Sequence, residues 1–156
     1  MPGSSESAEL RPVSICFPCT DSGTGRCRVG VAPTLAWTTN RVLCGVVCPA
    51  GEAGGPTVAQ GGWIAKVFDE VMAQVPIILG RGGITKELTV RYRKPVPIER
   101  ELEIEAWVSG EHGRYTIVSA ELRLADAVLA SAEATFVRVD IDEHYRAHEE
   151  WLAENG

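Results

Sequence analysis

The sequence has little that would suit a membrane or a nucleic acid. Its 156 residues contain no run of eighteen apolar residues, the length that a membrane-spanning helix needs. Fifteen Lys and Arg against twenty-one Asp and Glu give a net charge of −6, without a basic cluster that could neutralise a phosphate backbone. The first fifteen residues lack the charged-then-apolar order of a secretory signal. We therefore expect one cytoplasmic domain that binds neither membranes nor nucleic acids.

The cysteines do not complete a metal site. They are five in number, and Cys16 and Cys19 have the spacing of half a zinc site to which Cys27 could add a third sulfur. The sequence has no second close cysteine pair and no nearby histidine to close a tetrahedron. Free thiols and no bound metal are the expectation.

Histidine is scarce, and none of the three lies in the apolar centre of the chain. His112 falls in a predicted turn, while His144 and His148 fall in a polar C-terminal segment. Four residues apart on a helix, the latter two could share a metal, but a solvated helix face is the simpler interpretation. Catalysis through a histidine triad is therefore not supported.

The most informative segment is Val58–Val75, in which a glycine pair precedes an apolar helix. Its apolar residues recur with the three-and-four spacing of a buried helical face. They are Ile64, Val67, Phe68, Val71, Met72 and Val75. Asp69 lies beside this face, where a carboxylate is costly to bury unless a partner or ligand compensates it. Asp69 is accordingly a candidate functional residue. Pro76 is expected to end the helix.

The rest of the chain is predicted to be mainly β-strand, because polar and apolar residues alternate. The predicted strands cover residues 29–37, 41–47, 87–93, 101–108, 115–124 and 128–139. The polar residues 140–155 predict a terminal helix, and residues 1–12 have the composition of a frayed terminus. The order predicts an α+β fold with an antiparallel sheet around one long helix.

Several motifs give the chain a resemblance to a known family. Gln60-Gly61-Gly62 followed by Asp69 is similar to a His-Gly-Gly motif with an acidic residue nine positions after its histidine. The segment Ile84–Val96 ends with an aromatic residue, two further residues and a proline, and Cys16-Phe17-Pro18-Cys19 is similar to a Cys-Phe-x-Cys-Gly opening. Over about residues 14–139 the chain thus resembles the hotdog-fold acyl-CoA thioesterases, in particular the phenylacetate-degradation type.

The resemblance implies a division of the chain and an activity. The expected parts are a disordered tail over residues 1–13, a hotdog domain over 14–140, and a helical tail over 141–156. The expected activity is hydrolysis of an acyl-CoA thioester to a free acid and coenzyme A, in a homodimer or homotetramer. Coenzyme A would enter as part of the substrate, and no cofactor is expected.

Physical chemistry gives each site residue a role. At the first turn of the helix, the Gly61 N–H has no intrahelical partner and can stabilise an oxyanion. Asp69 would be the nucleophile or the general base for water, and the resemblance places Thr85 where some members hold that water. About 12 Å of helix axis separates Gly61 from Asp69, so the two would reach one carbonyl carbon only from different subunits.

Each role has a simpler alternative. The glycines can merely let the helix start close to the sheet, and Thr85 can be an ordinary strand residue. Asp69 can form an intersubunit salt bridge with Arg81, Arg91 or Arg93. Gln60 stands where the family has histidine; its amide can donate a hydrogen bond but cannot titrate near neutrality.

The remaining predictions concern the substrate. Gly62, Trp63 and Phe68 are predicted to contact the acyl group, for which the apolar surroundings favour a medium-chain or aryl type. Arg91, Arg93 and Lys94 are predicted to bind the phosphates of coenzyme A. Two other interpretations remain open: a non-catalytic hotdog protein that binds an acyl-CoA or fatty acyl ligand, and a purely structural dimerisation module.

Overall fold

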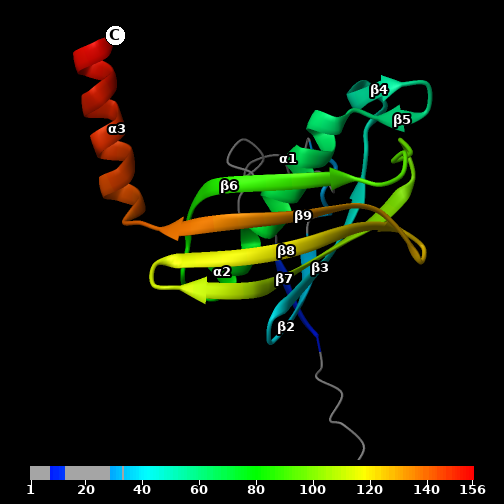
Figure 1. Ribbon diagram of the computed structural model, residues 1–156, viewed down its shortest axis with the longest axis horizontal. Helices are drawn as coiled ribbons and strands as arrows, with labels where there is room; N and C mark the ends of the chain where they lie inside the picture. The colour runs from blue at the N-terminus through cyan, green and yellow to red at the C-terminus, as the bar shows by residue number, and fades with distance from the viewer. Residues whose placement is uncertain (1–7, 13–28, 33) are drawn as a thin grey trace, which may run out of the picture.

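A curved antiparallel sheet packs against one helix in the computed structural model, which describes residues 8–12, 29–32 and 34–156 (Figure 1). The sheet has seven strands in the order β1-β2-β3-β7-β8-β9-β6, with every neighbouring pair antiparallel. Its strands are β1 (Glu9–Pro12), β2 (Thr34–Thr38), β3 (Arg41–Val47), β6 (Gly83–Tyr92), β7 (Glu101–His112), β8 (Tyr115–Leu124) and β9 (Ala127–Arg138). The predicted α+β class is confirmed.

Most predicted strands are present, some with other bounds: β2 begins at Thr34 although the predicted strand began at residue 29, and β6 begins at Gly83 although the predicted strand began at residue 87. The hairpin between β2 and β3 is confirmed, with Trp37 opposite Val42. β7 continues to His112, so the predicted turn over residues 110–113 is displaced toward Gly113, whose φ of 59° suits glycine. Residues 9–12 form β1, which pairs with β2, although they lie in the predicted disordered tail. Pairing with an existing edge strand satisfies backbone groups that local composition alone leaves to water.

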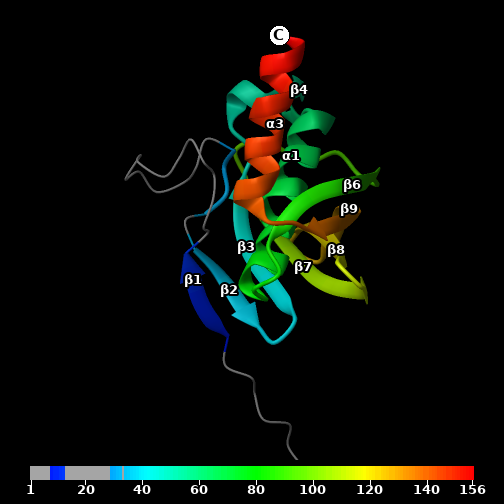
Figure 2. The same ribbon diagram turned by 90° about the vertical axis from the view of Figure 1, so that its left-hand side faces the viewer.

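The central helix α1 spans Gly61–Met72. All six residues of the predicted apolar face are buried, and α1 contacts β3, β6, β7, β8 and β9. Figure 2, turned by 90°, shows the sheet curving beneath this helix. The packing of one helical stripe into the concave side of the sheet thus forms the core.

The chain continues as helix beyond Pro76. A short helix α2 spans Gln74–Ile78 and has Pro76 as its third residue. The prediction that Pro76 ends the helical segment was wrong, because proline is tolerated in a first helical turn, where its missing N–H needs no partner. The break between the two helices lies at Ala73, the C-cap of α1 and the N-cap of α2.

A small second sheet lies before the central helix. A 3-10 turn η2 (Ala50–Glu52) leads into β4 (Ala53–Gly55), which pairs with β5 (Val58–Ala59). Gly54 allows close approach, since a Cβ there would be 2.8 Å from the Cα of Gln60. The salt bridge from Lys66 to Glu52, 2.9 Å long, also ties this segment to α1. The start of α1 is therefore held by its preceding hairpin.

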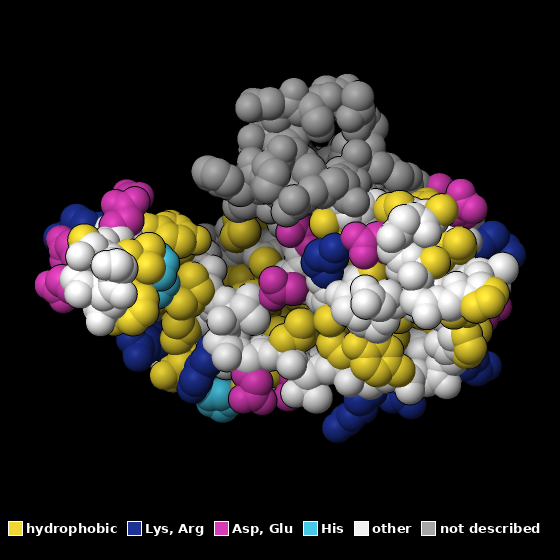
Figure 3. All heavy atoms as spheres, turned by 90° about the horizontal axis from the view of Figure 1, so that it is seen from above, with side chains coloured by type: hydrophobic (Ala, Val, Ile, Leu, Met, Phe, Trp, Pro, Cys, Tyr) yellow, Lys and Arg dark blue, Asp and Glu magenta, His cyan; other side chains and the backbone are white. Residues whose placement is uncertain are grey.

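Helix α3 (Ile141–Asn155) stands apart from the sheet. The side chain of Asp140 accepts a hydrogen bond from the Glu143 N–H and caps it. Figure 3 shows α3 at one side of the molecule, with charged and hydrophobic side chains exposed together. No helix among the described residues is long and apolar enough to cross a membrane.

Trp63 fixes α1 to the core by packing and by one hydrogen bond. Its side chain is fully buried, and its Nε1–H donates to the Val29 carbonyl over 2.8 Å. We expect Trp63→Phe to lower the free energy of unfolding by at least about 2 kcal/mol, because it leaves a buried carbonyl unpaired and a smaller ring in the site. Urea denaturation measures this. Trp151→Phe on exposed α3 is the matched control and should change stability little.

Candidate active site

The start of α1 is formed by the half-buried Gly61 and the exposed Gly62. Gln60 is the N-cap, and its backbone donates to the Glu52 carbonyl over 2.9 Å and accepts from the Ile64 N–H. The Gln60 side chain is exposed and makes no capping hydrogen bond, so Gln60 holds the helix start through its backbone. Gly61 follows as the first helical residue, where the N–H has no intrahelical acceptor.

Tyr92 holds this end of the helix from the strand opposite. Its hydroxyl donates to the Gly61 carbonyl over 2.9 Å, and its side chain remains 56% exposed. Gly61 and Tyr92 both line an open groove of about 310 Å³, together with Val58, Ala59, Ile64, Arg93, Lys94, Pro95 and Val96. Tyr92 belongs to the sequence motif over Ile84–Val96. Its hydrogen-bond partner Gly61 does not follow from that motif, because it depends on where β6 crosses the start of α1.

The second part of the site joins Asp69 and Thr85. The Thr85 hydroxyl donates to Asp69 Oδ1 over 2.7 Å, which links α1 to the first part of β6. Asp69 is half-buried beside the apolar face of α1. The structure thus brings together two of the four residues predicted to be catalytic.

A β-bulge makes this contact. Strict alternation along β6 would place Thr85 on the same side as Thr89 and Arg91, away from the helix. Lys86 is an extra residue in the pairing with β9, so that Thr85 lies opposite the buried Phe136 while Glu87 lies opposite Thr135. The bulge shifts the phase of the strand by one residue and turns Thr85 toward α1.

The two parts are at different ends of α1. Gly61 and Asp69 are eight residues apart on one helix, a separation of about 12 Å along its axis. The hydrogen bond from Thr85 orients Asp69. Arg81, one of the possible salt-bridge partners of Asp69, forms an ion pair with Glu111. It stays a prediction that Gly61 and Asp69 reach the same carbonyl carbon from different subunits.

Two of the residues predicted to contact the acyl group lie in the core. Trp63 and Phe68 are both 0% exposed, and Trp63 is tied to Val29. Gly62 is exposed next to Gly61. The residues of α1 that line the groove at the helix start are Gly61 and Ile64.

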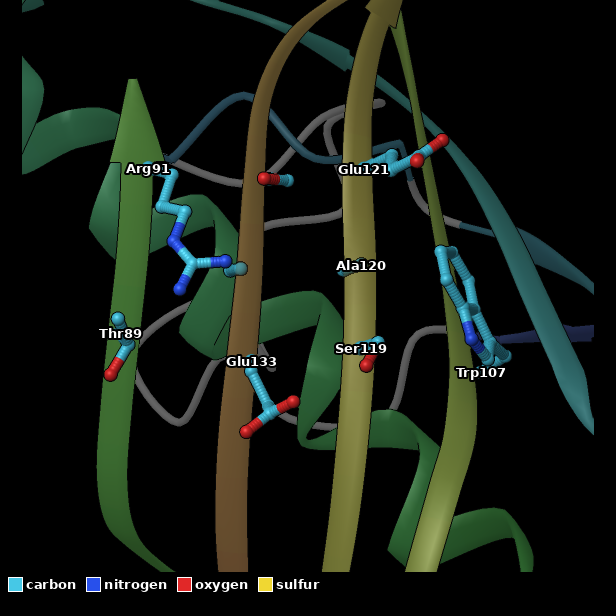
Figure 4. A pocket seen from close by; sticks show the side chains of 9 residues that line it. Thr89, Arg91, Trp107, Ser119, Ala120, Glu121 and Glu133 are labelled. Atoms are coloured by element: carbon cyan, nitrogen blue, oxygen red, sulfur yellow. The ribbon is translucent and has the colours of Figure 1, made fainter. Parts of the chain in front are cut away.

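The three basic residues predicted to bind phosphate do not all lie at the same place. Figure 4 looks onto the face of the sheet away from α1, where Arg91 points over a polar hollow of about 280 Å³ between Thr89 and Glu133. Arg93 lies 3.4 Å from the Ser131 hydroxyl on the neighbouring strand. Arg93 and Lys94 both line the groove at Gly61. Of the three, these two are thus placed to reach a ligand at the helix start.

Cysteine and histidine do not contribute to this site among the described residues. Cys44 and Cys48 are buried, and Cys16, Cys19 and Cys27 lie outside the described ranges. Within those ranges no group of three possible metal ligands occurs. His144 and His148 lie next to aromatic rings of α3, namely Tyr145 and Trp151.

Burial keeps the Cys48 thiol protonated. Desolvation, with a smaller effect from Glu52, raises its pKa from 9.0 to about 11. Since only about 0.1% is thiolate at pH 8, alkylation of Cys48 in folded protein should be at least about a hundredfold slower than in denaturant. Mass spectrometry of iodoacetamide-treated protein measures this, and rapid labelling of folded protein would contradict burial. Because the folded pKa is raised, stability should fall between about pH 9 and 11, and Cys48→Ala should flatten that fall.

The chain is similar to known proteins in sequence and in fold. Residues 57–131, from β5 to the first part of β9, match the sequence model of the Thioesterase superfamily. A solved structure of a thioesterase superfamily protein superposes with a TM-score of 0.63 at 28% identity, covering 69% of this chain and 53% of that one. The predicted resemblance to the hotdog-fold thioesterases is confirmed.

Two further proteins are similar to parts of this chain. The acyl-coenzyme A thioesterase THEM4 of Xenopus laevis is 32% identical over 82 residues, which are 53% of this chain and 37% of that protein. A phenylacetic acid degradation-related protein from Ralstonia eutropha JMP134 has the same fold, with a TM-score of 0.58 at 20% identity over 62% of this chain and 75% of that one. The chain spans little more than a third of the THEM4 sequence that it matches.

Proposed function

We propose that the protein is an acyl-CoA thioesterase in which Asp69 activates water. The observation that carries the proposal is the hydrogen bond from Thr85 to Asp69 Oδ1. It fixes the carboxylate and leaves the second carboxylate oxygen and the lone pairs of the hydroxyl as acceptors. A water that donates one hydrogen to each of them directs its own lone pair outward, as a nucleophile must be directed.

The reaction proceeds by addition and elimination. The water oxygen bonds to the thioester carbon while its proton passes to Asp69, and the carbonyl oxygen becomes an oxyanion. The N–H of Gly61 at the start of α1 stabilises that oxyanion, because it has no intrahelical partner and lies at the positive end of the helix. Collapse breaks the carbon–sulfur bond, and the coenzyme A thiolate takes the proton. The products are a free acid and coenzyme A.

A two-fold dimer would complete this site. β6 is an edge strand in the described sheet, and its edge is ten residues long. Near one end of β6 is Thr85, which contacts Asp69, and at the other end is Tyr92, which contacts Gly61. If two copies pair antiparallel through β6, the Thr85 end of one strand lies beside the Tyr92 end of the other. Asp69 and the partner subunit's Gly61 then flank one site.

The acyl group is proposed to be medium-chain or aryl. The groove beside Gly61 is walled by Val58, Ile64 and Val96, with the Tyr92 ring at its edge. These side chains offer apolar contact and few hydrogen-bond partners, which suits a hydrocarbon group.

Release of free thiol from a panel of short, medium, long and aryl acyl-CoAs tests the proposal. Turnover should be highest with medium-chain or aryl substrates. Saturable binding of an acyl-CoA without release of thiol would contradict hydrolysis and favour the non-catalytic binding protein. Absence of both binding and turnover would leave the structural dimerisation module.

A further inference from the structure

Basic side chains gather at the end of the sheet where α3 departs. In Figure 1 the start of β6, the β7–β8 hairpin and the end of β9 meet there. They surround a hollow of about 350 Å³ whose lining includes Arg81, Glu111, Arg114, Tyr115 and Arg138. We call Lys86, Arg114, Tyr115 and Arg138 the Tyr115 cluster.

The members of the Tyr115 cluster contact one another. The Lys86 Nζ lies 4.7 Å from the centroid of the Tyr115 ring, and the Arg114 guanidinium carbon lies 5.6 Å from it. The Arg138 N–H donates to the Arg114 carbonyl over 2.8 Å, which holds the two chain segments together. Hydrogen bonding from Arg114, and then the charge of Lys86, lowers the pKa of the Tyr115 hydroxyl.

The cluster carries positive charge that local carboxylates leave uncompensated. Glu111, the acidic residue in the lining, pairs with Arg81. Asp140, two residues after Arg138, caps α3. In the part of the chain that the structure describes, no ion pair involves Lys86, Arg114 or Arg138. Three exposed cations close together in a chain of net charge −6 favour an anionic ligand with several negative charges.

The position of the cluster relates it to the proposed site. Lys86 is the bulged residue next to Thr85, so the same bulge that turns Thr85 toward Asp69 presents Lys86 to Tyr115. A ligand with a thioester at Asp69 and a flexible arm could place a distant phosphate here. Arg91, by contrast, lies near the other end of β6, next to Tyr92.

We infer that Lys86, Arg114 and Arg138 bind the phosphates of the coenzyme A part of the substrate. This inference rests on the proposed function and names the residues that recognise the nucleotide end of that substrate. Guanidinium groups bind phosphate oxygens through paired, charge-assisted hydrogen bonds, and Lys86 adds a point charge. The arrangement would raise affinity for coenzyme A without touching the reacting carbon.

Calorimetry with coenzyme A and with pantetheine, which lacks the nucleotide and its phosphates, tests the inference without turnover. The variant Arg114→Gln/Arg138→Gln should bind coenzyme A at least about tenfold more weakly than wild type and bind pantetheine unchanged. Arg146→Gln, an exposed arginine of α3, is the control and should change neither. Unchanged affinity for coenzyme A, or equal weakening with both ligands, would overturn the inference.

Two further experiments distinguish failure of this inference from failure of the proposed function. In turnover assays the double variant should raise KM for acyl-CoA about tenfold at constant kcat, and leave hydrolysis of the matching acyl-pantetheine unchanged. If Arg91→Gln/Arg93→Gln gives these shifts instead, the phosphates bind near the Tyr92 end of β6 and the inference fails. If no thioester is hydrolysed, the proposed function fails, while the calorimetry still decides on the cluster.

Discussion

Asp69→Asn should reduce kcat/KM for acyl-CoA hydrolysis at least about a hundredfold, the contribution expected of a general base or nucleophile. The amide oxygen of asparagine can still accept the Thr85 hydroxyl, so the substitution keeps the contact at the start of β6 and removes the charge. Binding of coenzyme A should stay within a few-fold of wild type. The loss therefore isolates the chemical step.

A matched control is available at the β8–β9 turn. Asp126 is exposed there, far along the sheet from Thr85, and Asp126→Asn should leave turnover unchanged. Activity of Asp69→Asn within tenfold of wild type would contradict the proposed role of the carboxylate. Asp69 would then be a structural residue that anchors β6 to α1.

Gly61→Val should have an effect of similar size at the other end of α1. A Cβ at this position would lie 3.3 Å from the Tyr92 hydroxyl, and a branched side chain would fill the approach to the Gly61 N–H. An oxyanion can then no longer come within hydrogen-bonding distance of that donor, and such a donor contributes about a hundredfold or more in rate. Thiol release at saturating acyl-CoA measures the loss.

The comparison for Gly61→Val is the same substitution at an exposed glycine outside the site. Gly51 lies in η2, where an added Cβ would meet no atom within 4 Å. Gly51→Val should leave turnover unchanged. If Gly61→Val keeps wild-type kcat, the glycine serves only the close packing of the helix start.

The parts of the fold that depend on local pattern were predictable. The apolar face of α1 follows from helical spacing, and the hairpins follow from alternation bounded by turn residues. β1 and the helix that contains Pro76 were not predicted. Both depend on context that composition does not contain: an edge strand available for pairing, and the position of proline within a first turn.

The residues of the candidate site were easier to predict from the sequence than their arrangement in space. Gly61, Asp69 and Thr85 were identified from motif and spacing, and the hydrogen bond between Asp69 and Thr85 places two of them together. Simple alternation would have turned Thr85 away, because the bulge at Lys86 leaves no clear signal in one sequence. Tyr92 was part of a motif without an assigned partner, and Arg114 and Arg138 come together at the open end of the β8–β9 hairpin, which depends on the pairing register of these two strands.

A mixed dimer tests most directly whether the two parts of the site come from two subunits. Chains carrying Asp69→Asn and Gly61→Val are produced together with different tags, and the hybrid is purified by both tags. One of its two sites then has both substitutions and the other has neither, so the hybrid should recover about half of the wild-type activity although each parent is inactive. A hybrid of wild type with Asp69→Asn checks that purified hybrids turn over substrate. A double-variant hybrid as inactive as its parents would contradict a site shared between subunits.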